Sequence, residues 1–204
     1  CAGDGRDVLD VLREHPRARE VDALLVELDP GLAALARASA ARLPVGRVRV
    51  VEADAGATDS FAGGVPAEIV LACGVFDNVT DADVERTVRH LPEACAPAAT
   101  IVWTRGRFAP DLTPRIRDWF RASGFEEVEF VPIPHSTAAV GVHRLARPPD
   151  PFRPGEQWFS FLPFDERPSN RHRAARSVPT GEGGGPAARA SPGATTRGPT
   201  GPRS

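Results

Sequence analysis

The stretch Val21-Asp22-Ala23-Leu24-Leu25-Val26-Glu27 decides the fold class, because a short apolar run bounded by charge leads directly into a helical pattern. Its length and composition are those of a buried strand. Three later runs share this character, namely residues 47–52, 67–73 and 99–103. Near-continuous apolar runs of this kind are typical of strands that are covered on both faces, as in a parallel sheet.

Segments with helical periodicity alternate with these strands. Their expected apolar faces are Val8, Leu9 and Leu12; Leu32, Leu35, Ala36 and Leu43; Val84, Val88 and Leu91; and Ile116, Trp119 and Phe120. Asp81 is expected to cap the third helix and Thr113, before Pro114, the fourth, while Gly124 ends that helix. Strand–helix alternation with short connections predicts βαβ units and a mainly parallel sheet.

The pattern changes after Gly124, where residues 125–131 and 138–145 have the character of strands with no helix between them. The connection through residues 132–137 permits only antiparallel pairing, because a parallel crossover needs about a dozen residues or more. We therefore expect an α/β fold with a doubly wound, mainly parallel sheet and an antiparallel C-terminal strand.

Composition narrows the function classes. The chain has 204 residues, of which 41% are hydrophobic and 25% charged, which suffices for one domain with a core. A formal net charge of −2 gives no indication of a nucleic-acid or anionic-membrane partner. No apolar run approaches the roughly 18 residues of a membrane-spanning helix, and no secretory signal is visible. The three cysteines lack metal-ligand spacing. We expect a cytoplasmic protein with no membrane partner, no nucleic-acid partner and no metal.

Composition also predicts the domain organisation. We expect residues 1–162 to form one α/β domain and residues 163–204 to form a disordered tail rich in Pro, Gly and Arg. Near the end of the domain, residues 158–161 are expected to form a last short strand or a packing plug. The chain begins with Cys1 and contains neither Met nor Lys, so we expect it to start inside a longer reading frame, with the first strand largely missing.

The candidate binding loops are the segments that follow the strands, because ligands of open parallel sheets lie beyond the carboxyl ends of the strands. Gly3 and Gly5 permit a tight turn before the first helix, whose N-terminus favours an anionic group. Glu27 ends a strand and can accept hydrogen bonds from both hydroxyls of an adenosine ribose, a role for which Asp29 competes.

Two further loops carry similar features. Asp54 follows the next strand, where its carboxylate can accept from an adenine amino group. After the third apolar run, residues 67–73, Gly74 permits close approach of a ligand, and Val75 or Phe76 can pack on a flat ring. A polar turn or a solvated acid is the alternative at each position, so none of them identifies a nucleotide site alone.

The order and spacing of the four segments resemble the class I S-adenosylmethionine-dependent methyltransferases over about residues 1–145. Residues 1–5 match the glycine motif, with Cys1 where a first glycine usually stands, and Val26-Glu27-Leu28-Asp29-Pro30 matches the segment with the ribose-binding acid. The resemblance implies a Rossmann-like methyltransferase fold with a reversed last strand and S-adenosylmethionine as cofactor. The cofactor-binding residues that it implies are Gly3, Asp4, Gly5, Glu27, Asp54, Ala55, Gly74 and Val75.

The sequence also departs from that family and leaves rivals open. The acid that normally precedes the glycines would lie upstream of Cys1. An NAD-type Rossmann oxidoreductase needs a third glycine where Val8 stands, and it has no place for the Asp54 segment or an antiparallel last strand. A catalytically silent cofactor-binding or partner module is a non-enzymatic alternative, as is an interaction-prone fragment.

The resemblance predicts methyl transfer, with a small molecule as the expected acceptor. The loop with Asp77 and Asn78 lacks the Pro-Pro-aromatic turn of the methylases of DNA and glutamine amino groups, which disfavours a nucleic-acid acceptor. The groups expected to reach the carboxyl edge as a base are Asp77, Asn78, Thr104, Arg105 and His135. No catalytic residue is assigned, and the oligomeric state is not predicted.

Overall fold

The computed structural model describes residues 1–43, 47–168 and 170. Its helices and strands alternate as the sequence predicts. The first half contains α1 (Arg6–Glu14), β1 (Asp22–Glu27), α2 (Pro30–Ala40), β2 (Arg47–Glu52) and β3 (Ala67–Ala72). The second half contains α3 (Asp81–Ala94), β4 (Cys95–Gly106), α4 (Thr113–Ala122), β5 (Phe125–Pro132) and β6 (Ala138–Leu145). Short 3-10 helices cover η1 (Ala18–Glu20), η2 (Thr58–Gly64) and η3 (Phe164–Glu166).

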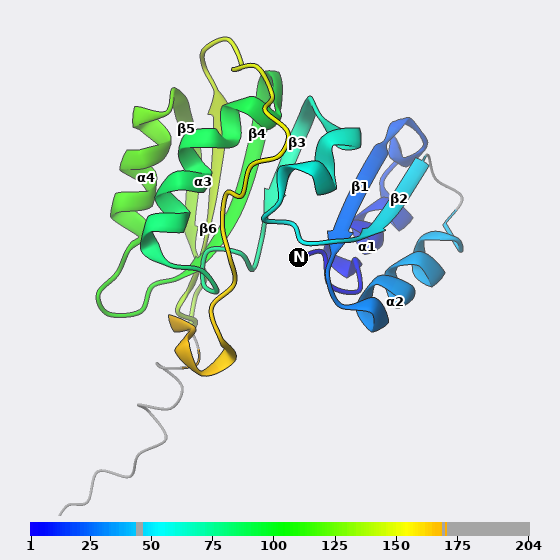
Figure 1. The fold of residues 1–204 in the computed structure, drawn as a ribbon, viewed down its shortest axis with the longest axis horizontal. Coiled ribbons are helices and arrows are strands. Elements are labelled where there is room, and N and C mark those ends of the chain that lie inside the picture. Colours follow the sequence, from blue (N-terminus) through cyan, green and yellow to red (C-terminus); the bar gives the residue numbers. More distant parts are fainter. Residues whose placement is uncertain (44–46, 169, 171–204) are drawn as a thin grey trace, which may run out of the picture.

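The described strands form two sheets rather than one. β1 and β2 pair in parallel, and a second sheet has the order β3-β4-β6-β5. β3 and β4 are parallel, whereas β6 is antiparallel to both of its neighbours. The two sheets lie side by side, with the N-terminus between them (Figure 1). The mainly parallel sheet with an antiparallel C-terminal strand is thus confirmed.

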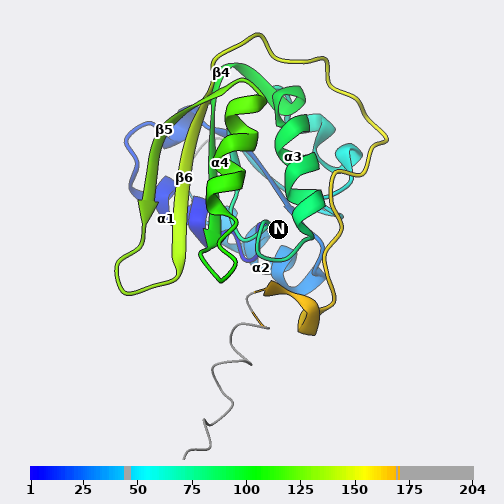
Figure 2. The ribbon, with the colours of Figure 1, turned by 90° about the vertical axis from the view of Figure 1, so that its left-hand side faces the viewer.

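The main core lies between the four-stranded sheet and the helices α3 and α4, which cover one of its faces (Figures 1 and 2). Val84, Val88 and Leu91 of α3 are buried as predicted, as are Ile116 and Phe120 of α4. Apolar residues at helical spacing therefore identified the packed face of both helices.

The predicted face of α2 is right for Ala36 and wrong for its leucines. Leu32 and Leu35 are 39% and 56% exposed, Ala33 and Ala36 are fully buried, and Leu43 lies beyond the helix. α2 packs on β1 and β2 through its alanines, because small side chains allow a close approach between helix and sheet. A helix of mixed Leu and Ala carries apolar residues on several faces, so periodicity alone cannot fix which one is buried.

Two predicted helix caps are shifted by one or two residues. Thr80, not Asp81, caps α3 by accepting a hydrogen bond from the Asp83 amide at 3.1 Å. At α4 the Asp111 carboxylate accepts from the Thr113 amide at 2.9 Å, and Thr113 is already helical. Gly124 follows α4 with a φ of +87°, the left-handed conformation expected of a residue that ends a helix.

Residues 158–161 form no strand, and the alternative prediction of a packing plug is the correct one. Trp158 and Phe159 are 3% and 5% exposed and join the core, and only an isolated bridge links Gln157 to Ala57. Most of the predicted tail, residues 163–204, lies outside the described residues, so the domain boundary stays a prediction. Among the described residues, no helix is both long and apolar enough to cross a membrane.

Candidate functional site

The four predicted loops meet at the edge where the parallel strands have their carboxyl ends. The Ala2 amide donates to the Val26 carbonyl at 2.9 Å, and the Ala53 amide donates to the Glu27 carbonyl at 3.0 Å. These bonds join the first three loops. The fourth lies beside the first, because Cys1 of the glycine turn packs against the core cluster to which Ala72 and Val75 belong.

The glycine turn has the backbone that the sequence predicts. Gly3 and Gly5 have φ values of +58° and +77°. A Cβ on Gly5 would lie 2.9 Å from Leu9 and 3.0 Å from Leu25, so any larger residue would be both strained and crowded. Gly5 caps α1 without a side chain. The Asp4 carboxylate pairs with the Arg6 side chain, whose hydrogen bond lowers the pKa of Asp4.

Glu27 joins the glycine turn to the start of α2. One carboxylate oxygen accepts from the Gly3 amide at 2.7 Å, and the other accepts from the Asp29 amide at 2.9 Å. The side chain is largely buried, which raises the pKa of Glu27. The hydrogen bonds from the two amides lower this pKa by more than burial raises it, so the pKa of Glu27 lies below its ordinary value. A charged carboxylate held from two sides at a strand end suits a pair of hydroxyl donors.

The alternative acid, Asp29, has another role. Its side chain accepts from the Leu32 amide at 2.8 Å and caps α2. The positive end of the helix dipole also stabilises a carboxylate at this position. Between the two acids that the sequence left open, Glu27 is the one whose carboxylate contacts the glycine turn.

Asp54 lies in a tight turn after β2. Its Oδ1 accepts from the Gly56 amide at 2.8 Å, and its Oδ2 accepts from the Gln157 side chain at 3.0 Å. Ala55 packs against the core as a partly buried residue. The Gln157 contact was not predicted, because Gln157 is far away in sequence and carries no recognisable motif.

The loop after β3 combines open and buried residues. Gly74 has a φ of +73°, and a Cβ built on it would have no neighbour within 4 Å, so the space beside its backbone is open. Val75 and Phe76 instead belong to the core, and Phe76 is fully buried with its ring 6.0 Å from that of Trp103. The expectation that Phe76 packs on a ligand ring is wrong, because its faces are already covered by protein.

The candidate bases near this loop are held by protein partners. Both carboxylate oxygens of Asp77 accept from the Gly106 amide at 3.0 Å, and Asp77 pairs with the buried Arg105 at 3.4 Å. Burial raises the pKa of Asp77 above its ordinary value, against the opposing effects of Gly106 and Arg105. Asn78 donates to the Gly74 carbonyl at 2.5 Å, and the Thr104 hydroxyl accepts from the Gly74 amide at 2.9 Å.

His135 occupies the exposed turn between β5 and β6 with a φ of +57°. The sheet order is β3-β4-β6-β5, so β4 separates this turn from the loop after β3. His135 thus lies at the predicted edge of the molecule but away from the four loops, and nothing here makes it a catalytic residue.

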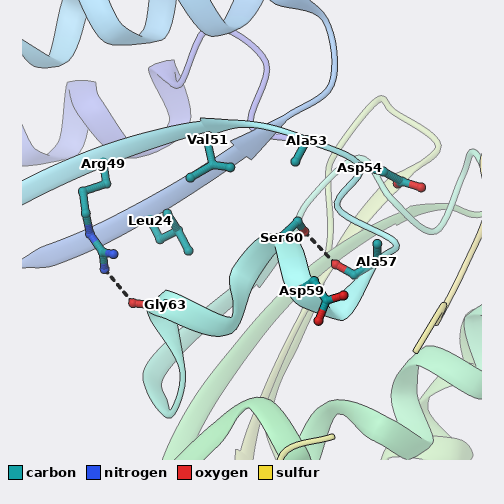
Figure 3. Close-up of a pocket in the computed structure, with 9 residues that line it drawn as sticks. All are labelled: Leu24, Arg49, Val51, Ala53, Asp54, Ala57, Asp59, Ser60 and Gly63. Atoms are coloured by element: carbon teal, nitrogen blue, oxygen red, sulfur yellow. Dashed lines mark hydrogen bonds between the residues drawn. The ribbon is translucent and has the colours of Figure 1, made fainter. Parts of the chain in front are cut away.

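A cavity of about 500 Å³ lies between η2 and the strands β1 and β2. Of the predicted cofactor-binding residues, Asp54 alone lines it. Figure 3 shows α-helices on one side of the two strands and η2 on the other, with Leu24 and Val51 on the cavity floor. The Asp54 carboxylate points away from that floor (Figure 3). The cavity is therefore distinct from the place where the four loops meet.

One cluster with metal-ligand chemistry was not predicted. Ligand atoms of His90, Glu93 and Glu156 lie within 4.8 Å of one another. The Arg153 guanidinium already lies among them, 2.6 Å from Glu93 and 3.0 Å from His90. The cluster thus contains its own cation, and we interpret it as an ion-pair network that attaches the C-terminal segment to α3.

No family model matches the sequence, and neither does any curated protein. Solved structures do match in fold. An O-methyltransferase family protein from Burkholderia thailandensis has a TM-score of 0.58 at 18% identity, over 71% of this chain and 49% of its own. A TehB-like SAM-dependent methyltransferase from Corynebacterium glutamicum has a TM-score of 0.51 at 17% identity, over 70% and 75%. The fibrillarin pre-rRNA processing protein of Methanococcus jannaschii has a TM-score of 0.50 at 12% identity, over 61% and 56%.

The chain has the fold of the class I methyltransferases. That fold explains why β6 is antiparallel between β4 and β5, an arrangement that the rival NAD-type reading does not accommodate. The chain spans about half the length of the Burkholderia protein and of the methyltransferase SibL. The methyltransferase fold also occurs in a protein of pre-rRNA processing, so the fold by itself does not decide between small-molecule and nucleic-acid acceptors.

Proposed function

We propose that this chain is the cofactor-binding domain of an S-adenosylmethionine-dependent methyltransferase that acts on a small molecule. The observation that carries the proposal is the position of Glu27, a buried carboxylate at the end of β1 that accepts from the Gly3 amide. A ribose placed beside the glycine turn, over the Glu27 carboxylate, would donate its hydroxyls to the remaining lone pairs of that carboxylate.

The remaining predicted residues fit the other parts of the cofactor. Asp54 would accept from the adenine amino group, with Ala55 beside it. Gly74 has open space where a side chain would stand, which allows the cofactor to approach the backbone. Asp4 lies within the glycine turn, and Val75 follows Gly74 in the loop after β3, with its side chain in the core. The assignment of these residues rests on the proximity of the four loops.

The bound cofactor would supply an activated methyl group, so the protein needs mainly to position the acceptor and exclude water. The loops after β3 and β4 are rigid at this edge, because the Gly74 amide donates to Thr104 and the Gly106 amide donates to Asp77. An acceptor that must lose a proton would find Asp77, whose pKa is raised by burial. The net charge of −2 supports a small-molecule acceptor, because it provides no electrostatic attraction for a polyanion.

The test is calorimetric titration of S-adenosylhomocysteine into the chain and into its Glu27→Ala variant. We expect Glu27→Ala to weaken binding by about 10-fold or more, as befits lost hydrogen bonds to a charged acceptor. Asp29→Asn is the matched control, because it removes a nearby charge but keeps an acceptor for the Leu32 amide. Equal losses in both variants would contradict the ribose assignment, and uptake of a dinucleotide instead would overturn the proposed function.

A further inference from the structure

The C-terminal strap, residues 153–162, crosses α3 and ends beside the candidate cofactor loops. It follows β6 and descends along the helical layer to the opposite end of the sheet (Figures 1 and 2). Arg153 attaches its start to Glu93 of α3 at 2.6 Å. Trp158 is buried, with its ring 5.2 Å from Phe61 and 5.9 Å from His90. The strap is thus a packed part of the domain.

Backbone hydrogen bonds fix the strap against the turn that contains Asp54. The Thr58 amide donates to the Glu156 carbonyl at 2.9 Å, and the Trp158 amide donates to the Gly56 carbonyl at 2.8 Å. A Cβ on Gly56 would lie only 2.1 Å from the Phe159 carbonyl oxygen, which shows how closely the two backbones approach. Further along, the Leu162 amide donates to the Asn78 carbonyl at 2.9 Å. The strap therefore connects the loop after β2 with the loop after β3, although these strands belong to different sheets.

Gln157 is the strap residue that contacts a proposed cofactor ligand directly. Its side-chain amide donates to Asp54 Oδ2 at 3.0 Å and to the Phe159 carbonyl at 2.7 Å, so both amide hydrogens are used. Asp54 Oδ1 is held separately by the Gly56 amide at 2.8 Å. Each carboxylate oxygen has one donor, which fixes the plane of the carboxylate and leaves further lone pairs on it.

We propose that Gln157 is a positioning residue that makes the site selective for a 6-aminopurine. The inference rests on the proposed function, in which Asp54 accepts from the adenine amino group. A carboxylate held in one orientation by Gln157 accepts a hydrogen bond from the 6-amino group of the base. It disfavours a 6-oxopurine, because the carbonyl oxygen at the same position would face the carboxylate with no proton between them. Without Gln157, the Asp54 side chain can rotate away from a mismatched base.

The experiment compares the affinities of S-adenosylhomocysteine and S-inosylhomocysteine, its 6-oxo analogue, for the full chain by calorimetry. We expect the unmodified chain to prefer the adenine form by about 10-fold or more, and Gln157→Leu to reduce this preference to about 3-fold or less. Ser160→Leu, an equally apolar change at an exposed strap position, should leave the preference unchanged. The ratio is measured within each protein, so a loss of folded fraction affects both ligands equally.

Two further variants separate the possible failures. In an Asp54→Ala background, Gln157→Leu should have no additional effect on the ratio, because its action passes through that carboxylate. An unchanged preference in Gln157→Leu, together with weaker binding in Glu27→Ala, would overturn the role of Gln157 and leave the proposed function intact. An effect of Gln157→Leu that persists without Asp54 would also overturn it. If the unmodified chain binds neither ligand, the proposed function itself fails.

Discussion

His143 illustrates how a single buried side chain sets a pH limit on stability. It is 1% exposed, stacks on Phe120 at 4.3 Å, and accepts from the Trp103 indole at 3.1 Å through Nδ1. The ring must therefore be neutral, with its proton on Nε2. Burial lowers the pKa of His143 from 6.5 to about 4, despite the nearby Glu127.

The consequence is a loss of stability in acid. Between pH 6.5 and about 4 the unfolded chain binds a proton at His143 that the folded chain does not, so the free energy of unfolding falls as the pH falls through this range. We expect His143→Gln to flatten this dependence by about 2–3 kcal/mol, measured by urea denaturation at several pH values. His135→Asn, in the exposed turn, is the control and should keep the slope. An identical slope in both variants would assign the acid sensitivity to other groups.

Gly141 meets the same aromatic cluster from β6. A Cβ on Gly141 would lie 2.2 Å from the Trp103 ring, which is fully buried, so the ring can move only by disturbing its neighbours in the core. We expect Gly141→Ala to lower the free energy of unfolding by about 3 kcal/mol, because the insertion forces the indole off its packed position. Gly63→Ala is the control, since its nearest neighbour is the end of the Arg49 side chain. Urea denaturation measures both, and a small effect at Gly141 would show that the cluster can repack.

At the scale of the element, the strap depends on one ion-pair cluster. The buried Glu93 side chain is hydrogen-bonded to Arg153 and His90. Burial raises the pKa of Glu93, but the hydrogen bonds from Arg153 help to bring it below its ordinary value. Removing Arg153 would leave a buried carboxylate without its main partner, so the strap should open more often.

Hydrogen exchange tests this prediction for Arg153→Met. We expect the amides of Trp158 and Leu162, which bond to Gly56 and Asn78, to exchange on the order of 10-fold faster than in the unmodified chain. Arg17→Met removes an exposed ion pair with Glu20 and should leave both amides unchanged. Faster exchange in both variants would indicate a global loss of stability, and no change in Arg153→Met would mean that packing of Trp158 alone holds the strap.

At the scale of the whole molecule, β1 and β3 both lie at a sheet edge among the described strands. β3 pairs only with β4 among the described strands, and Ile69 and Leu71 on it are 65% and 45% exposed. An apolar edge with free backbone groups is a template for pairing with another strand. We therefore expect concentration-dependent self-association of this chain.

Sedimentation velocity checks the prediction with a charge placed on the edge. Ile69→Lys should shift the chain toward the monomer and change the free energy of unfolding by less than about 0.5 kcal/mol, because the side chain is exposed. Val11→Lys alters a similarly exposed residue on α1, 59% exposed, and should leave association unchanged. Equal effects of the two substitutions would point to general apolar contact rather than strand pairing.

The order of the elements, the antiparallel last strand and the loops that hold the candidate residues could be predicted from the amino-acid sequence. These features follow from local patterns: apolar runs, helical spacing, and a connection after β5 too short for a parallel crossover. The residues of α3 and α4 that pack inward were predictable for the same reason. The buried face of α2 was not, because Leu and Ala surround that helix and only contact with β1 and β2 selects the alanines.

Which groups meet across long separations in the chain depends on tertiary packing. Glu27 and Asp29 are both acids after a strand, and the contact with the Gly3 amide distinguishes them. Phe76 has the spacing of a ligand-facing residue, yet the core covers it. Gln157 reaches Asp54 from a segment with no motif, because packing of Trp158 carries the strap to that turn. Local sequence encodes backbone propensity, whereas these contacts arise only when distant surfaces pack together.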